Sequence, residues 1–384
     1  MVDLLALPAT PAVLAILPRL QAALRGTAPM IPYAVGSPPP APVPDDALLP
    51  DDLAAILGTS GSTGSPKRAL LTAAALTASA NATHAHLGGP GQWLLALPPH
   101  HIAGLQVLLR SVVAQSNPIV MDLTAGFEAG AFATAAGQLD AGQRRYTSLV
   151  PAQLGRLLDD PAAAAALATL DAVLLGGQAL DPRLRTRAQG AGVQVIATYG
   201  MTETAGGCVY DGIPLSGVRI AVEDTGRILL GGPTLAAGYL GDPDRTTAAF
   251  HGHDDQRWFR TDDAGTLTDG RLHVDGRLDD LINTGGLKVS PRLVEEAITA
   301  TFPTIVDVCV VGIPDPRWGE AIAAATVARS GTPPVDLPTL RAGLAGTLPG
   351  YALPHQVTQV DALPLRGPGK TDRAAVAALF AMGG

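Results

Sequence analysis

The chain has 384 residues, 47% of them hydrophobic and 16% charged, and this length suffices for two or three domains with large cores. Acidic residues outnumber basic ones by 34 to 26, and the net charge of −8 disfavours a general binder of nucleic acid or of an anionic membrane surface. The two cysteines, Cys208 and Cys309, lie far apart without histidine or cysteine neighbours at ligand spacing, which excludes a disulfide scaffold and a zinc site and fits a reducing cytoplasm.

The first 20 residues are apolar but do not have the pattern of a signal peptide or of a membrane helix. Asp3 comes early, no basic residue precedes the apolar run, and Pro8, Pro11 and Pro18 interrupt it. We therefore expect no membrane insertion. Residues 34–52 are rich in proline and aspartate, which predicts a stiff extended connection.

A regular alternation of short apolar runs and helix-like stretches follows this connection. It predicts an α/β fold whose mostly parallel sheet is covered by helices. The predicted strands are 53–58, 93–97, 118–121, 146–150, 171–175 and 193–198. The predicted helices lie near 71–86, 101–115, 127–139, 151–158 and 181–190.

The pattern changes twice in the second half of the chain. From about residue 213 the glycines become dense, which predicts a β-rich subdomain. After Gly276 a helix at 291–301, an apolar strand at 305–312 and a last helix from about 372 predict a small α+β domain. We predict a large N-terminal domain at 1–277 and a small mobile C-terminal domain at 278–384.

A Ser/Gly-rich loop directly after the first predicted strand is the strongest local signal. Its backbone N–H groups and hydroxyls suit a polyphosphate, and Lys67 adds a positive charge at its end. The loop differs from a Walker A motif, because Pro66 and Arg68 stand where that motif has glycine and Ser/Thr. A plain flexible turn is the alternative. The predicted phosphate-binding residues are Thr59, Ser60, Gly61, Ser62, Thr63, Gly64 and Lys67.

Six segments in order resemble the motifs of the adenylate-forming superfamily, which includes acyl- and aryl-CoA synthetases, luciferases and peptide-synthetase adenylation domains. They are TSGSTGSPK at 59–67, PPHHIAG at 98–104, YGMTET at 199–204, WFRTDD at 258–263, GRLDDLI at 276–282 and PLRGPGK at 364–370. The resemblance implies the family's two-domain fold, with ATP, CoA and a small-molecule carboxylate as substrates and Mg²⁺ as cofactor.

The resemblance also implies roles for residues around the nucleotide. Glu203 is a hard oxygen ligand for Mg²⁺ beside the phosphates, and Thr202 faces the phosphates with it. Asp263 and Arg277 match the ribose-binding positions, although Asp262 stands where the family usually has glycine. The residues that match the adenine pocket are Gly176, Gly177, Gln178, Tyr199 and Gly200.

The C-terminal motifs imply catalysis and domain movement. Lys370 matches the catalytic lysine that covers the charge of the adenylation transition state. It is one of only three lysines in a chain with 26 basic residues, where arginine does the ordinary surface work. Asp279 matches the hinge, and Gly286 lies in the segment that faces the pantetheine of CoA. Lys288, beside it, is assigned to the same hinge and CoA segment, with chance survival as the alternative.

The acid-site segment indicates the class of carboxylate. Members of the family that activate amino acids have an aspartate there, whereas this chain has His100 and His101, so an amino acid is disfavoured. The short N-terminal part and the local segments resemble the o-succinylbenzoate–CoA ligases of menaquinone biosynthesis. The acid-binding candidates are His101, which we also expect to take part in catalysis, Arg145, Ser148 and Met201.

Three functions stay open at this point. The preferred one is a cytoplasmic acid–CoA ligase for o-succinylbenzoate, as a monomer or a homodimer. The second is an adenylating enzyme that transfers another aryl or acyl group to CoA or to a carrier protein. The third is an NTPase or nucleotide sensor that uses the Ser/Gly loop alone.

Overall fold

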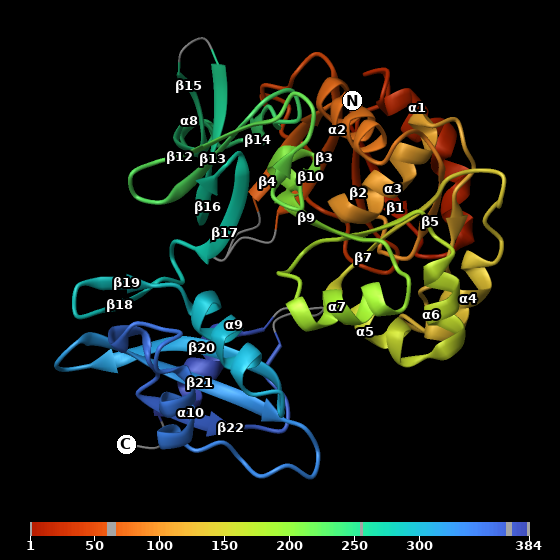
Figure 1. Cartoon of the computed structure of the whole chain (residues 1–384). Helices are drawn as coiled ribbons and strands as arrows, with labels where there is room; N and C mark the ends of the chain where they lie inside the picture. The colour runs from red at the N-terminus through yellow and green to blue at the C-terminus, as the bar shows by residue number, and fades with distance from the viewer. Residues whose placement is uncertain (1, 60–66, 254–255, 366–370, 382–384) are drawn as a thin grey trace. The chain divides into compact units, whose positions relative to one another are not determined.

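The structure is a computed structural model that describes residues 2–59, 67–253, 256–365 and 371–381 (Figure 1). The chain forms two compact units. The large unit holds residues 1–221, 229–261 and 267–272, and the small unit holds 222–228, 262–266 and 273–384. The small unit thus includes two short segments before Arg277, and the domain boundary at that residue stays a prediction.

The central sheet of the large unit has seven strands in the order β11-β10-β9-β8-β7-β5-β6. Strands β6, β5, β7, β8 and β9 are parallel, whereas β10 and β11 are antiparallel additions at one side. This arrangement confirms the predicted α/β class. The strands are β5 (Gln92–Leu95), β6 (Ile119–Val120), β7 (Arg145–Leu149), β8 (Ala172–Leu175), β9 (Val195–Met201), β10 (Gly206–Tyr210) and β11 (Ile213–Pro214).

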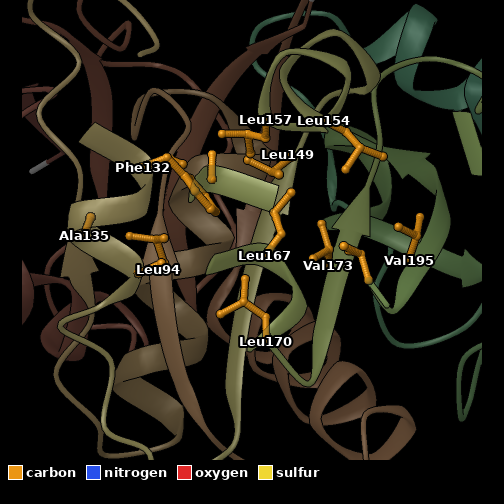
Figure 2. Packing of buried hydrophobic residues seen from close by; sticks show 14 of the residues in the cluster. Leu94, Phe132, Ala135, Leu149, Leu154, Leu157, Leu167, Leu170, Val173 and Val195 are labelled. Carbon is orange, nitrogen blue, oxygen red and sulfur yellow. The ribbon is translucent and has the colours of Figure 1, made fainter. Parts of the chain in front are cut away.

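Helices connect and cover these strands. They are α2 (Ala73–His86), α3 (Ile102–Val113), α4 (Ala129–Ala136), α5 (Pro151–Asp159), α6 (Pro161–Ala168) and α7 (Pro182–Gly190). Figure 2 shows Phe132, Leu154 and Leu167, from three of these helices, packed beside Leu149 and Val173 of the sheet. Helix α6 was not predicted, because its alanine-rich sequence has no polar face to reveal a helical period. Within the described ranges, no helix is both long and apolar enough to cross a bilayer.

A second sheet in the large unit has the order β1-β2-β3-β4-β14. The strand predicted at 53–58 forms as β3, but it lies in this second sheet and not in the parallel one; β4 returns antiparallel to it, with Thr59 opposite Lys67. The Ser/Gly loop therefore joins two strands of a hairpin. The elements of this part are β1 (Asp3–Leu7), the 3₁₀ helix η1 (Pro11–Ile16), α1 (Leu17–Ala23), β2 (Met30–Ala34), β3 (Leu53–Thr59), β4 (Lys67–Thr72) and β14 (Gly238–Tyr239).

The glycine-rich stretch after residue 213 forms the expected β-rich part. Its sheet has the order β12-β13-β16-β15, and β17 also pairs with β16. The elements are β12 (Arg219–Val222), β13 (Arg227–Gly231), α8 (Pro243–Ala249), β15 (Phe250–His253), β16 (Gln256–Thr268) and β17 (Arg271–Arg277).

The rest of the small unit is an α+β fold, as predicted. Its sheet has the order β19-β18-β21-β20 with β22 on β21, and its buried residues form two clusters, one of which includes Val294, Val310 and Ile322. Ser290 caps the helix predicted at 291–301 by accepting a bond from the N–H of Leu293. The elements are β18 (Ile282–Thr284), β19 (Leu287–Val289), α9 (Pro291–Thr301), β20 (Ile305–Asp315), β21 (Gly319–Ala328), α10 (Leu337–Leu344), the 3₁₀ helix η3 (Gly350–Ala352), β22 (Gln356–Gln359) and α11 (Arg373–Ala381).

Candidate functional site

Most of the predicted site residues in the large unit lie along one edge of its central sheet. The parallel strands β5, β7, β8 and β9 end there, with Leu149 of β7 opposite Leu175 of β8. Open parallel sheets bind ligands at this carboxyl edge. The predicted residues on or after these strand ends are His101, Ser148, Gly176, Gly177, Gln178, Tyr199, Gly200, Met201, Thr202 and Glu203.

The tight turn from β9 to β10 depends on glycine. In this antiparallel pair Gly200 lies opposite Gly207, and Met201 lies opposite Gly206. A Cβ atom on Gly200 would lie 2.2 Å from the carbonyl oxygen of Gly206, which leaves no room for a side chain. The glycine thus permits the close approach that brings the turn to the edge of the sheet.

Hydrogen bonds hold the backbone of this turn in place. Thr202–Thr204 form the 3₁₀ helix η2, and Ala205 follows in a left-handed conformation with φ of 53°. The N–H of Met201 donates to the Thr204 hydroxyl oxygen at 2.9 Å, and that hydroxyl donates to the carbonyl of Gly206 at 2.7 Å. The N–H of Ala236 donates to the carbonyl of Glu203 at 2.8 Å. These contacts fix the position from which the Glu203 side chain extends.

The Glu203 carboxylate lies close to the end of the Ser/Gly loop. The residue is only 7% exposed, and Oε1 accepts a hydrogen bond from the Tyr239 hydroxyl at 2.9 Å. The ammonium of Lys67 lies 5.6 Å from the centre of the Tyr239 ring. The structure therefore brings together Lys67 and Glu203, two charged residues that the sequence assigns to the phosphates.

Several predicted residues lie outside the described part of the chain. They are Ser60, Gly61, Ser62, Thr63 and Gly64 of the Ser/Gly loop, and Lys370. Thr59 and Lys67 flank this loop segment, and they pair with each other at the loop end of the β3–β4 hairpin.

The donors around Glu203 suit a magnesium ion that is shared with phosphates. Thr202 and Glu203 are both nearly buried at the carboxyl edge, and they offer a hydroxyl and a carboxylate oxygen. Mg²⁺ is usually held in this way, by one or two protein oxygens together with phosphate and water oxygens. Among the described residues there is no group of three His, Cys, Asp or Glu side chains that would hold a metal ion alone.

The predicted acid segment forms the start of α3. His101 is the residue before the helix, and its side chain makes no capping hydrogen bond. Its ring lies 4.2 Å from that of His100, whose pKa is lowered to about 4, first by burial and then by the charge of His101. Because the His101 side chain makes no capping hydrogen bond, helix capping, one alternative to a functional role, does not explain His101.

Arg145 lies at the opposite edge of the sheet from the other acid-binding candidates. It is the first residue of β7, opposite Gln92, and its N–H donates to the Asp171 carboxylate at 2.8 Å. Four residues of extended strand, or about 13 Å, separate it from the carboxyl end at Leu149. The predicted strand at 146–150 begins directly after Arg145, which already indicates the amino end, and the structure does not bring Arg145 to the site.

A different arginine, Arg110 of α3, is buried in the large unit, and no motif of the sequence included it. It is 3% exposed, its guanidinium donates to the Tyr210 hydroxyl at 3.3 Å, and it lies 5.0 Å from the centre of the Trp93 ring. Burial lowers its pKa. No carboxylate of the described residues forms an ion pair with it. One turn earlier, Gln106 donates to the carbonyl of Ala205, so this face of α3 lies against the turn that carries Glu203. No local pattern distinguishes Arg110 from an arginine whose guanidinium reaches solvent.

The predicted ribose and hinge residues lie in the small unit. The guanidinium of Arg277 donates to both carboxylate oxygens of Asp279, at 2.7 and 3.0 Å, and lies 3.6 Å from Asp262. The pKa of Arg277 is raised, first by its hydrogen bond to Asp279 and also by the charges of Asp279, Asp263 and Asp262. Arg277 thus connects the predicted ribose position with the predicted hinge.

The predicted CoA segment of the small unit is an exposed hairpin. Gly286, with φ of 81°, lies in the turn between β18 and β19. Lys288 is exposed in β19, opposite Asn283.

Comparison with known proteins gives two family matches. Residues 10–240 match the family model of AMP-binding enzymes, and residues 294–370 match that of the AMP-binding enzyme C-terminal domain. The chain is 48% identical over 386 aligned residues to a probable 2-succinylbenzoate–CoA ligase of Mycobacterium tuberculosis, with 97% of each chain covered. It is 32% identical to a 2-succinylbenzoate–CoA ligase of Listeria monocytogenes, over 83% of this chain and 68% of that one.

Solved structures share the fold. ATP-bound MatB from Rhodopseudomonas palustris matches with a TM-score of 0.76 and 27% identity, over 86% of this chain and 68% of that one. The o-succinylbenzoate CoA synthetase of Bacillus subtilis, in complex with its acyl-adenylate intermediate, matches with a TM-score of 0.75 and 24% identity, over 98% of this chain and 82% of that one.

Proposed function

This chain belongs to the family of AMP-binding enzymes, and we propose that it is an AMP-forming ligase that joins 2-succinylbenzoate to coenzyme A. The observation that carries the proposal is the 48% identity, over 97% of both chains, to the probable 2-succinylbenzoate–CoA ligase of Mycobacterium tuberculosis. The family models match both halves of the chain, so the alternative of a nucleotide sensor built on the Ser/Gly loop alone has no support.

The proposed reaction has two steps. First, a carboxylate oxygen of the acid attacks the α-phosphorus of ATP, which releases pyrophosphate and leaves an acyl-adenylate. Second, the thiol of CoA attacks the acyl carbon, which releases AMP and a proton and leaves a thioester. Negative charge builds at the α-phosphorus in the first step, and we assign Lys370 to stabilise it.

We assign the nucleotide to the carboxyl edge of the central sheet. Support comes from the shared position of Lys67 and Glu203 beside Tyr239, at the end of the Ser/Gly loop. Mg²⁺, when bound with ATP, neutralises phosphate charge, and Thr202 and Glu203 are the residues that we expect to hold it. We assign the adenine to Gly176, Gly177, Gln178, Tyr199 and Gly200, and the ribose to Asp263 and Arg277.

The substrate of the mycobacterial relative has a second carboxylate, on the benzoate ring, which needs donors or a positive charge inside an apolar pocket. We assign the acid to the edge that carries His101, Ser148 and Met201. Arg110 lies nine residues after His101 on α3, about 13 Å along the helix axis, and beside Trp93 near the amino end of β5, so we do not assign it to the acid.

We propose that Asp279 is the hinge between the two half-reactions, since they need different groups at one site. Asp279 forms an ion pair with Arg277, two residues earlier in the same unit. Gly286 and Lys288, on the β18–β19 hairpin, then serve the CoA step. We also propose a cytoplasmic location, where ATP and CoA are available.

A panel of acids tests this function. The protein is incubated with Mg-ATP, CoA and 2-succinylbenzoate, ferulate, benzoate or a medium-chain fatty acid, and pyrophosphate and thioester mass are measured. We expect thioester formation from 2-succinylbenzoate to be at least about a hundredfold faster than from benzoate, because only 2-succinylbenzoate has a second carboxylate for the site to bind. Thioester from another acid only would move the assignment to a different acyl or aryl ligase, such as the feruloyl-CoA synthase of Amycolatopsis, to which the chain is 31% identical over 85% of its length.

A further inference from the structure

We propose that Tyr239 is a positioning residue that orients the Glu203 carboxylate for the magnesium–ATP complex. The inference rests on the proposed function in one respect only, the assignment of Glu203 to the metal and phosphates. No motif of the sequence analysis included Tyr239, which lies in the GYLGD segment after the glycine-rich stretch.

The contact between the two side chains is buried. The Tyr239 hydroxyl donates to Glu203 Oε1 at 2.9 Å, and the two residues are only 5% and 7% exposed. A hydrogen bond from a neutral donor to a carboxylate gains strength where water is excluded. The tyrosine thus fixes one oxygen of the carboxylate, and with it the plane of the group.

The tyrosine is itself held from several sides. Its strand β14 pairs with β4, which places Tyr239 opposite Ala69, and its N–H donates to the Thr246 hydroxyl oxygen at 2.9 Å. Its ring lies 5.7 Å from that of Phe250. A donor with so little freedom keeps its partner in one orientation before the ligand arrives, which lowers the entropic cost of binding.

Lys67 completes the arrangement. Its ammonium lies 5.6 Å from the centre of the Tyr239 ring, on the strand that leaves the Ser/Gly loop. A cation at the face of a phenol ring draws electron density from it and makes the hydroxyl a stronger donor. Tyr239 therefore contacts both charged residues that we assign to the phosphates, one through its ring and the other through its hydroxyl.

The test uses Tyr239→Phe, which keeps the ring and removes only the hydroxyl. ATP affinity is measured by calorimetry on the full-length protein without acid, once with EDTA and once with Mg²⁺. We expect the affinity in EDTA to stay within about twofold and the gain in affinity from Mg²⁺ to fall about tenfold, the effect of losing a hydrogen bond to a charged group. The half-maximal Mg²⁺ concentration for pyrophosphate exchange should rise by a similar factor.

A matched control is Tyr146→Phe. This tyrosine is also buried, and its hydroxyl donates to the carbonyls of Leu87 and Gly89, at 3.1 Å each, near the amino end of β7. The control loses a buried hydroxyl in the same unit, and we expect it to leave the Mg²⁺ dependence of ATP binding unchanged. Thermal unfolding of both variants shows that each is folded.

A double variant shows whether Tyr239 acts through Glu203. In a Glu203→Gln background, Tyr239→Phe should change the Mg²⁺-dependent gain in affinity by less than about twofold. A tenfold loss in that background, an equal loss in EDTA, or no loss in the single variant would each overturn the inference. ATP binding does not involve the acid, so a protein that behaves as expected here but makes no thioester from 2-succinylbenzoate would contradict the proposed function alone.

Discussion

Gly104→Ala perturbs the acid segment from a defined point. Gly104 lies in the first turn of α3, and a Cβ atom there would lie 2.2 Å from the carbonyl oxygen of Pro98. Ordinary contacts of this kind begin at 3.4 Å, so the segment before the helix must move by about 1.2 Å. Overpacking of this size costs about 1–3 kcal/mol, and the better helix propensity of alanine offsets about 0.5–1 kcal/mol of it. We expect a net loss of about 1–2 kcal/mol in the free energy of unfolding.

The functional effect should be larger than the loss of stability. The displaced segment, residues 98–101, ends at His101, and a 1 Å misplacement of a positioning group costs on the order of a hundredfold in rate. We therefore expect acid-dependent pyrophosphate exchange to fall by about that factor, while ATP affinity measured without acid stays the same. Urea unfolding and isotope exchange measure the two effects.

Gly155→Ala is the matched control for this substitution. Gly155 lies in α5, and a Cβ atom there would have no heavy atom within 4 Å. This variant should be more stable than the parent by about 0.5–1 kcal/mol and fully active. A Gly104→Ala protein as stable and as active as the Gly155→Ala protein would refute the steric argument and the assignment of this segment to the acid.

Three further predictions concern single side chains. Lys370→Ala should slow adenylate formation by a factor of a thousand or so, yet leave thioester formation from synthetic acyl-adenylate less affected, and equal losses in both half-reactions would contradict its role. Arg145→Met should leave acid selectivity unchanged, because Arg145 lies at the amino end of β7, and a rise of about tenfold in the KM for 2-succinylbenzoate in steady-state kinetics would restore Arg145 to the site. Burial, and secondarily the charge of Arg110, lowers the pKa of His84 to about 4. The unfolded chain therefore binds a proton below pH 6.5 that the folded one does not, and stability falls from pH 6.5 to 4. His84→Gln should flatten this fall in urea unfolding at pH 7.5 and 5, and an unchanged slope would contradict the assignment.

The parts of the fold that could be predicted are those with a clear period or a clear signal at their ends. Residues 172–175 of the predicted strand at 171–175 form a fully buried strand of a parallel sheet, and Ser290 with Pro291 begins a helix in the predicted place. The position of Glu203 at the carboxyl edge also followed from its place after an apolar strand, since that edge is where parallel sheets bind ligands.

Other features depend on contacts between distant residues and left no local signal. Arg110 resembles any arginine of an amphipathic helix, and its burial is decided by Tyr210 and Trp93, far away in sequence. Tyr239 gains its importance from β4, which carries it to Glu203. Arg145 shows the reverse case, because its place directly before the predicted strand 146–150 already indicated the amino end of β7, away from the carboxyl edge.

The central claim is that a carboxylate oxygen attacks the α-phosphorus of ATP. The most direct measurement uses 2-succinylbenzoate with ¹⁸O in both oxygens of its succinyl carboxylate, followed by mass spectrometry of the products after turnover with CoA. Attack by the carboxylate predicts one ¹⁸O atom in each AMP, with the other retained in the thioester carbonyl. Unlabelled AMP, or label in inorganic phosphate together with ADP, would contradict the account.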